Sequence, residues 1–244
     1  MTPIADEDLE AAFRRGAADD LEVLAALHDR ELDAERLAAL AEIQFPAQLN
    51  MALTGERAQR IVPVMTAVTS ALWAATLDGS ESFDQLAAAY ADIYLTNALG
   101  THPTESPWID KDGLIRQQPA IACRDWYGKH NLRVHDANIR SEDHIVHQLE
   151  FLVHLLRLEG GDGLAEAERF LREHPLRWFG QFAQRIEQRR GPYFYAGLAE
   201  LTDLYLTELA RVLAALVPET DREGCGPPPA SACEDGLGKC CPRA

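Results

Sequence analysis

Residues 141–156 read SEDHIVHQLEFLVHLL, and this stretch decides the fold class. After a polar start its apolar residues follow the spacing of an amphipathic helix and do not alternate as in a strand. We expect a helix over about 142–158, with Ser141 as its N-cap. Asp143 and His144 then fall in the first turn, where the helix dipole favours a carboxylate and disfavours a protonated histidine.

The same spacing continues on both sides of this stretch. Further helices are expected within residues 1–42 and over about 56–77, 83–98, 120–130, 164–173, 176–189 and 193–216. Glycine and proline residues interrupt the pattern over 99–118, a loop that carries Trp108. No segment alternates with period two, so no strand is expected. The prediction is an all-α protein, a single globular domain of about eight to ten helices over residues 1–217.

The charge balance narrows the classes of partner. The 244 residues hold 39 Asp and Glu against 23 Lys and Arg, a formal net charge of −16. Such a chain does not suit nucleic acid, whose binding needs clustered cations. It suits a basic partner, although the charge also serves solubility alone.

The sequence predicts a cytoplasmic protein without membrane insertion. The first ten residues, MTPIADEDLE, lack the basic and apolar regions of a secretory signal. Residues 61–77 are uncharged but contain Pro63 and several hydroxyl side chains. They are interpreted as a buried core helix, because they are too short and too polar to span a bilayer.

Residues 218–244 differ sharply from the rest of the chain. They hold five Pro, four Gly and four of the five cysteines, with almost no large apolar side chains. We therefore expect a flexible tail, because it buries too little surface to offset its ordering entropy. The weak metal candidates of this chain lie here: Cys225, Cys233, Cys240 and Cys241. Their spacing matches no common ligand pattern, so free thiols are the preferred interpretation. Cys123 is expected in the core.

Signatures of catalysis are missing from the sequence. It has no G-x-S-x-G elbow, phosphate-binding loop or dinucleotide fingerprint. His147, Glu150 and His154 share a helical face, but no second helix supplies a matching Glu-x-x-His pair. A solvated face therefore explains these histidines better than a metal site. Asp143 and His144 allow two interpretations, capping of a helix or an acidic recognition point at its start.

Six stretches together resemble the TorD/DmsD family of molybdoenzyme maturation chaperones. In order they are LAAAYADIYL, THPTESPWID, PAIACRDWYGKHNL, SEDHIVHQLEFLVHLL, HPLRWFGQF and GPYFYAGLAELTDLYL. The resemblance covers about 83–216, whereas residues 1–82 match only as an acidic helical region. Asp143-His144 matches the family's signature dipeptide. The family usually has Glu-Pro where this chain has Arg140-Ser141, which replaces a carboxylate by a cation.

The resemblance implies a chaperone, not an enzyme. Such proteins bind the twin-arginine leader and often the body of a molybdoenzyme precursor, and delay export until the molybdenum cofactor is inserted. The resemblance implies no firmly bound cofactor. It allows the binding of a guanine nucleotide, or a transient contact with molybdopterin guanine dinucleotide through the client. The family includes monomers and domain-swapped homodimers.

A receptor for a leader needs carboxylates beside an apolar groove. The candidate acids are Asp143, Glu142 and Glu105, with His144 beside them, and the candidate groove residues are Tyr90, Tyr94, Trp108 and Trp126. Each aromatic taken alone is more often a core residue than a ligand surface. The alternative function is a metal- or iron–sulfur-handling redox protein that uses the tail cysteines.

Overall fold

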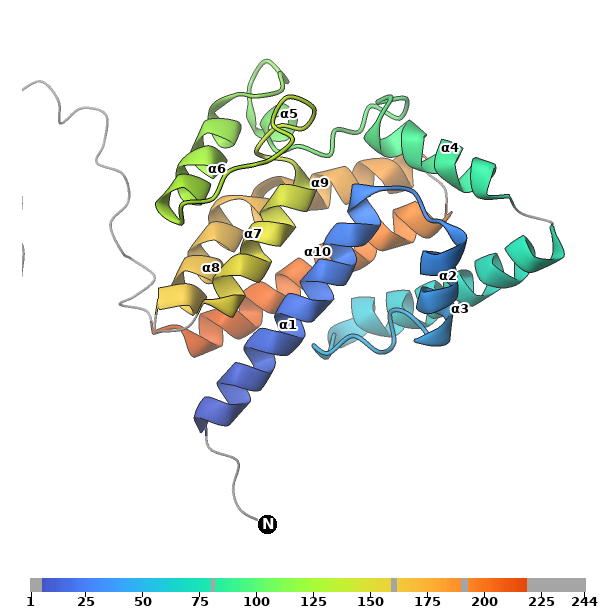
Figure 1. Ribbon diagram of the computed structural model, residues 1–244, viewed down its shortest axis with the longest axis horizontal. Helices are drawn as coiled ribbons and strands as arrows, with labels where there is room; N and C mark the ends of the chain where they lie inside the picture. The colour runs from blue at the N-terminus through green and yellow to red at the C-terminus, as the bar shows by residue number, and fades with distance from the viewer. Residues whose placement is uncertain (1–5, 80–81, 159–161, 190–192, 219–244) are drawn as a thin grey trace, which may run out of the picture.

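The computed structural model describes residues 6–79, 82–158, 162–189 and 193–218, which form ten helices and no strand (Figure 1). This confirms the predicted all-α class. The tail with its four cysteines lies outside the described residues. The helices are α1 Asp6–Asp29, α2 Ala34–Glu42, α3 Gly55–Asp78, α4 Phe83–Tyr94, α5 Ser106–Ile109, α6 Gln118–Lys129, α7 Ile145–Arg157, α8 Asp162–Glu173, α9 Pro175–Gln188 and α10 Tyr193–Leu216.

The long helices α1 and α10 cross the middle of the molecule (Figure 1). α1 packs along α7, while α10 contacts α3, α8 and α9. The largest fully buried side chains include Trp178 and Phe182 of α9 with Tyr195 and Tyr205 of α10. Each buried side chain of this size contributes about 2–3 kcal/mol by leaving water, so these crossings hold most of the stability.

Helix α4 shows that periodicity identified a buried face correctly. Its buried residues are Leu86, Tyr90, Ile93 and Tyr94, as the spacing predicts. Ser82 caps the helix: its side chain accepts from the Gln85 amide, and Gln85 Oε1 accepts from the Ser82 amide.

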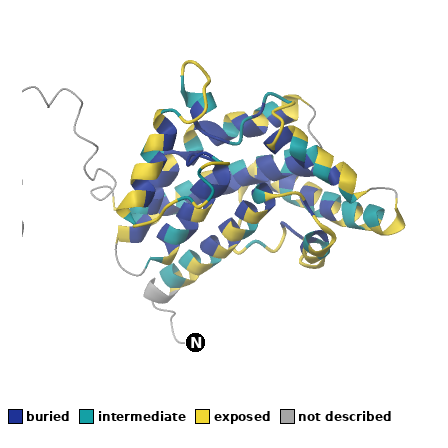
Figure 2. Ribbon diagram, turned by 45° about the horizontal axis from the view of Figure 1, so that its top comes forward, coloured by how far each residue is buried: buried dark blue, intermediate teal, exposed yellow. Residues whose placement is uncertain are grey.

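Helix α3 contradicts the prediction of a buried core helix over 61–77. Only a stripe faces the interior, formed by Ala58, Ile61, Met65 and Thr69. Met65 lies over Gly197 of α10, where a Cβ would stand 2.1 Å from the Met65 sulfur. Only 17% of the most apolar window is buried, so most of the helix is exposed (Figure 2). Among the described helices, α3 alone has the length and hydropathy that could cross a membrane.

The start of α7 also differs from its prediction. The helix begins at Ile145 and its N-cap is His144, whose Nδ1 accepts a 3.2 Å hydrogen bond from the Val146 amide. Ser141 is therefore not the cap, and Asp143 precedes the first turn. The reason is tertiary: the Ile145 amide donates to the Pro103 carbonyl, and the Glu105 amide donates to the Asp143 carbonyl. By contrast, the predicted start at Asp33 is confirmed, because its side chain accepts from the Arg36 amide.

A buried carboxylate fastens the segment between α2 and α3. Asp20 of α1 is 2% exposed. Its Oδ1 accepts from the Asn50 amide at 2.8 Å and from Asn50 Nδ2 at 2.9 Å. Its Oδ2 accepts from the Met51 amide at 2.8 Å and from the Tyr205 hydroxyl at 3.1 Å. One side chain thus joins α1, α10 and the chain leading into α3.

We expect Asp20→Ala to lower the free energy of unfolding by about 2–4 kcal/mol, because it leaves several buried donors without an acceptor. Urea denaturation followed by circular dichroism measures this loss. Asp19→Ala is the control: that side chain is 60% exposed and its bond to Arg157 should contribute no more than about 1 kcal/mol. Equal losses in both variants would contradict the assignment.

Candidate functional site

The signature dipeptide begins with a fully buried carboxylate. Asp143 Oδ2 accepts from the Ser106 amide at 2.7 Å and from the Ser106 hydroxyl at 2.5 Å. The Ser106 Oγ in turn accepts from the Gln117 amide at 3.0 Å. Asp143 therefore holds the start of α5 against the start of α6 and does not reach the surface.

His144, the second residue of the dipeptide, is 6% exposed and forms an isolated antiparallel bridge with Thr104. Burial lowers the pKa of His144 well below 6.5, with His147 and Arg140 adding to the effect. The imidazole is consequently neutral at pH 7, which suits its role as an acceptor at the cap of α7.

Glu105 also points into the interior. It is fully buried, and its Oε2 lies 2.9 Å from His174 Nδ1 and accepts from Gln148 Nε2 at 2.8 Å. Cys123 Sγ lies 3.4 Å from the same His174 nitrogen, which confirms that this cysteine is a core residue. Within the described part of the chain, Glu105, Cys123 and His174 are the one group whose donor atoms lie close enough to share a metal ion.

A pocket of about 420 Å³ opens between α4 and three loops, which follow α4, precede α6 and precede α7. We call it the tyrosine pocket, and it is lined by Tyr90, Tyr94, Leu95, His102, Pro103, Thr104, Ile115, Arg116, Ile139, Arg140, Ser141 and His144. Three apolar side chains on its lining are strongly exposed: Leu95 at 67%, Ile115 at 53% and Ile139 at 84%. Exposed aliphatic side chains around a cavity are typical of a site that receives an apolar ligand.

Buried polar bonds hold the two tyrosines in place. The Tyr90 hydroxyl donates to the Asp29 carbonyl at 2.7 Å, and the two tyrosine rings stack at 4.5 Å. The Tyr94 hydroxyl lies 2.6 Å from His28 Nδ1, while Thr202 Oγ1 lies 3.0 Å from Nε2. Burial lowers the pKa of His28 to about 3 and raises the pKa of Tyr94 well above 10. Both groups stay neutral across physiological pH.

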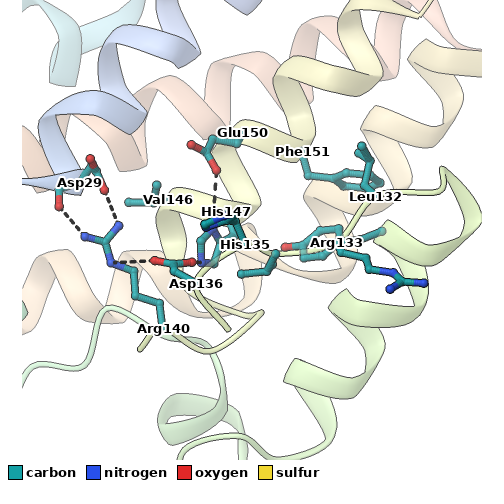
Figure 3. A pocket seen from close by; sticks show the side chains of 12 residues that line it. Asp29, Leu132, Arg133, His135, Asp136, Arg140, Val146, His147, Glu150 and Phe151 are labelled. Carbon is teal, nitrogen blue, oxygen red and sulfur yellow. Dashed lines mark hydrogen bonds and ion pairs between the residues drawn. The ribbon is translucent and has the colours of Figure 1, made fainter. Parts of the chain in front are cut away.

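A second pocket, of about 450 Å³, also has Arg140 on its lining (Figure 3). We call it the carboxylate pocket, because Asp29, Asp136 and Glu150 line it. The remaining lining residues are Tyr127, Leu132, Arg133, Val134, His135, Arg140, Val146, His147 and Phe151. Arg140 lines both pockets and is the only described residue common to the two linings.

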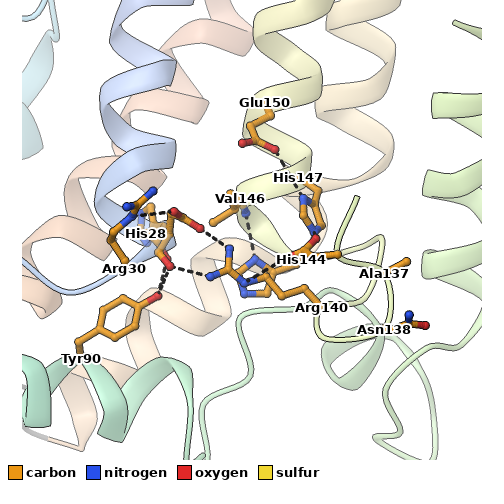
Figure 4. Close-up of polar contacts among 12 residues, drawn as sticks. His28, Arg30, Tyr90, Ala137, Asn138, Arg140, His144, Val146, His147 and Glu150 are labelled. Atoms are coloured by element: carbon orange, nitrogen blue, oxygen red, sulfur yellow. Dashed lines mark hydrogen bonds and ion pairs between the residues drawn. The ribbon is translucent and has the colours of Figure 1, made fainter. Parts of the chain in front are cut away.

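Arg140 forms an ion pair with Asp29 at the end of α1 and donates to the Asp29 carbonyl at 2.7 Å (Figure 3), and Figure 4 shows Arg140 close to His144. Its Nε lies 3.7 Å from Asp136 Oδ2. Burial alone would raise the pKa of Asp29, but Arg140 and Arg30 bring that pKa below 3.8. The cation that departs from the family pattern thus fixes the loop before α7 to α1.

The structure brings some of the predicted site residues together and separates others. Tyr90, Tyr94 and His144 share the tyrosine pocket. Trp108 donates from Nε1 to the His102 carbonyl next to that pocket, and Glu142 pairs with Arg124 at 2.6 Å. Partner binding by these residues remains a prediction.

Neither pocket is lined by Asp143, Glu105 or Trp126. Asp143 and Glu105 are buried in the hydrogen bonds described above. Trp126 is 5% exposed and packs against Phe170, with Lys129 and Arg169 over its ring. His147 also differs from the predicted solvated face, because it is only 9% exposed and lies 3.1 Å from Asp136.

The sequence did not identify Asp29, Asp136, Ile115 and Ile139 as site residues. Asp29 lies 111 positions before Arg140, and no local pattern links the two. Exposed isoleucines in a loop give no periodic signal either. The candidate tail cysteines lie outside the described residues, so the redox alternative stays a prediction.

Comparison with known proteins gives concordant matches. The family model described as nitrate reductase delta subunit matches residues 62–184, which include the lining of the tyrosine pocket. Chaperone protein TorD of Vibrio cholerae serotype O1 is 30% identical over 145 residues, 56% of this chain and 66% of the relative. TorD of Vibrio vulnificus is 29% identical over 78% of this chain and 91% of the relative. A probable Tat proofreading chaperone DmsD of Haemophilus influenzae is 31% identical over 43% of this chain and 50% of the relative.

We expect Asp143→Asn to lower the free energy of unfolding by about 1.5–3 kcal/mol, because an amide is a weaker acceptor for the two Ser106 donors. Urea denaturation checks this. Asp125→Asn, an exposed carboxylate on α6, is the matched control and should stay within about 0.5 kcal/mol of wild type. A loss of only a few tenths in Asp143→Asn would show that the carboxylate merely decorates the helix start.

A second expectation concerns pH. The folded-state pKa of His28 is about 3 and its ordinary value is 6.5, so between these values the unfolded chain binds the proton and the folded chain does not. Stability should therefore fall as pH drops below 6.5, by about 2 kcal/mol from this residue by pH 5. Unfolding curves from pH 7.5 to 5 measure the slope. His28→Gln should show a shallower decline, and an unchanged slope would contradict the assignment.

Proposed function

The chain belongs to the nitrate reductase delta subunit family, and we propose that it is a proofreading chaperone of the TorD and DmsD type for a molybdoenzyme precursor. Its matched relatives are named chaperones, which agrees with the prediction that it is not an enzyme. The predicted resemblance to the TorD/DmsD family is confirmed.

Our proposal that the ligand is the precursor's twin-arginine leader rests on the tyrosine pocket. A leader presents an arginine pair followed by an apolar run, and an apolar run needs a hydrophobic groove with unpaired aliphatic side chains. Leu95, Ile115 and Ile139 offer such side chains at the mouth, and Tyr90 with Tyr94 forms a stacked base. The buried dipeptide Asp143-His144 fixes the loops that line this pocket.

We further propose that binding takes place in the cytoplasm and delays export until the molybdenum cofactor has been inserted into the client. Contact with the client's body, with molybdopterin guanine dinucleotide through the client, or with a guanine nucleotide remains a prediction. So does the choice between a monomer and a domain-swapped homodimer.

We expect a synthetic leader peptide of a molybdoenzyme from the same genome to bind with micromolar or tighter affinity, less tightly at higher salt. Ile139→Ser and Ile115→Ser should each weaken binding about five- to tenfold, since each removes about 1–1.5 kcal/mol of apolar contact. Isothermal titration calorimetry measures the affinities.

Leu77→Ser is the matched control, because Leu77 is 69% exposed but lies at the end of α3 outside both pockets. It should bind as wild type does. A wild-type protein that binds no leader would overturn the proposed function. Normal binding by both isoleucine variants would remove the tyrosine pocket from it.

A further inference from the structure

We propose that the carboxylate pocket receives the arginine pair of the leader, with Asp136 and Glu150 as its carboxylates. This rests on the proposed function and assigns the cationic part of the ligand to residues that the sequence did not single out. The apolar run of the leader would then lie in the tyrosine pocket, across Arg140.

The tyrosine pocket cannot recognise the arginines itself. None of the described residues lining it is an Asp or Glu, whereas Arg116 and Arg140 both line it. The nearby acids are already engaged, since Asp143 binds Ser106, Glu105 lies against His174 and Glu142 pairs with Arg124. Carboxylates for a guanidinium must therefore come from beyond this pocket.

Asp136 and Glu150 flank one buried imidazole in the carboxylate pocket (Figure 3). His147 Nε2 lies 3.1 Å from Asp136 Oδ1, and His147 Nδ1 lies 3.5 Å from Glu150 Oε2. His147 is only 9% exposed, yet its Nε2 makes no hydrogen bond with any described group. Since Nε2 already faces the Asp136 carboxylate, the imidazole orients this acid, and both carboxylates keep lone pairs available to a further donor.

The charges of the two carboxylates are incompletely compensated. Glu150 is 63% exposed, and no Lys or Arg of the described residues lies within 4.0 Å of its oxygens. Among the Lys and Arg side chains of the described residues, Arg140 alone approaches Asp136, with its Nε at 3.7 Å. Asp29, by contrast, already has Arg140 and Arg30 as partners. The pocket can thus accept added positive charge at Asp136 and Glu150.

Arg140 itself shows that a guanidinium fits beside Asp136. It is held between Asp29 and Asp136, and it separates the two pockets. A leader that crosses it would extend the same arrangement, with one guanidinium at Asp136 and the other at Glu150. Leu132, Val134 and Phe151 on the same lining can pack against the methylene stems of the arginines.

The two pockets also suit the order of a leader. Both pockets share Arg140, and an extended chain advances about 3.3 Å per residue. An arginine pair and the apolar run a few residues later can therefore occupy adjoining pockets of one peptide path. The net charge of −16 favours approach of the cationic end.

The test compares two synthetic leader peptides by calorimetry, one natural and one with both arginines replaced by glutamine. We expect Glu150→Gln and Asp136→Asn to weaken binding of the natural peptide about five- to twentyfold. Neither variant should alter binding of the glutamine peptide, which wild type should bind more weakly than the natural one. Because Glu150 is largely exposed, its variant should fold normally, and circular dichroism checks both.

Glu56→Gln is the matched control, an exposed carboxylate on α3 outside both pockets, and it should bind both peptides as wild type does. Unchanged affinity for the natural peptide in both pocket variants would overturn this inference. The proposed function would still stand in that case, because the wild-type protein binds the peptide. Equal losses for the two peptides would also overturn it, since the carboxylates would then not act on the arginines. If wild type bound neither peptide, the proposed function itself would fail, and this inference with it.

Discussion

The hydrogen bonds from Ser106 to the Asp143 carboxylate are the interaction on which the site depends. Asp143 receives both the amide and the hydroxyl of Ser106, which also accepts the Gln117 amide at the start of α6. The starts of α5 and α6 and the residues before α7 are thereby fixed to each other. A buried carboxylate that accepts charge-assisted bonds is strongly directional, so it sets the position of the loop and not merely its burial. The family's signature aspartate is best understood as the residue that builds the pocket, with the leader proposed to contact its neighbours.

The scaffold and the site are stabilised by different forces. Helices α1, α7, α9 and α10 pack through aliphatic and aromatic side chains, so their burial provides most of the stability. The loops around 103–117 and 132–144 depend instead on hydrogen bonds and ion pairs among Ser106, Asp143 and Arg140. Such an arrangement places adaptable loops on a rigid helical frame, which is where binding sites commonly occur.

Charge is divided between two adjoining surfaces of the same site. The tyrosine pocket has an apolar mouth with arginines on its lining, and the carboxylate pocket beyond Arg140 has the acids. A ligand that has a cationic end and an apolar end matches the two pockets in only one orientation. Arg140 therefore separates the two chemistries, and the substitution of the family's usual carboxylate by this cation has a structural consequence. It ties the loop before α7 to the carboxyl end of α1 through Asp29.

The sequence by itself determined the helical class, nearly all helix positions, the buried face of α4 and the family. These follow from the spacing of apolar residues and from the order of local motifs, both of which are properties of neighbouring residues. It did not determine that α3 is mostly exposed, because apolar composition shows that a helix can be buried, not how many neighbours cover it. It also placed Asp143 in a helix and at the surface, although the Pro103 and Glu105 backbone holds residues 143 and 144 outside the first turn. The contact of Arg140 with Asp29 joins residues far apart in the chain, and only packing of α1 against α7 brings them together. Local periodicity therefore decided the helices, whereas the site was decided by long-range polar contacts that no local pattern records.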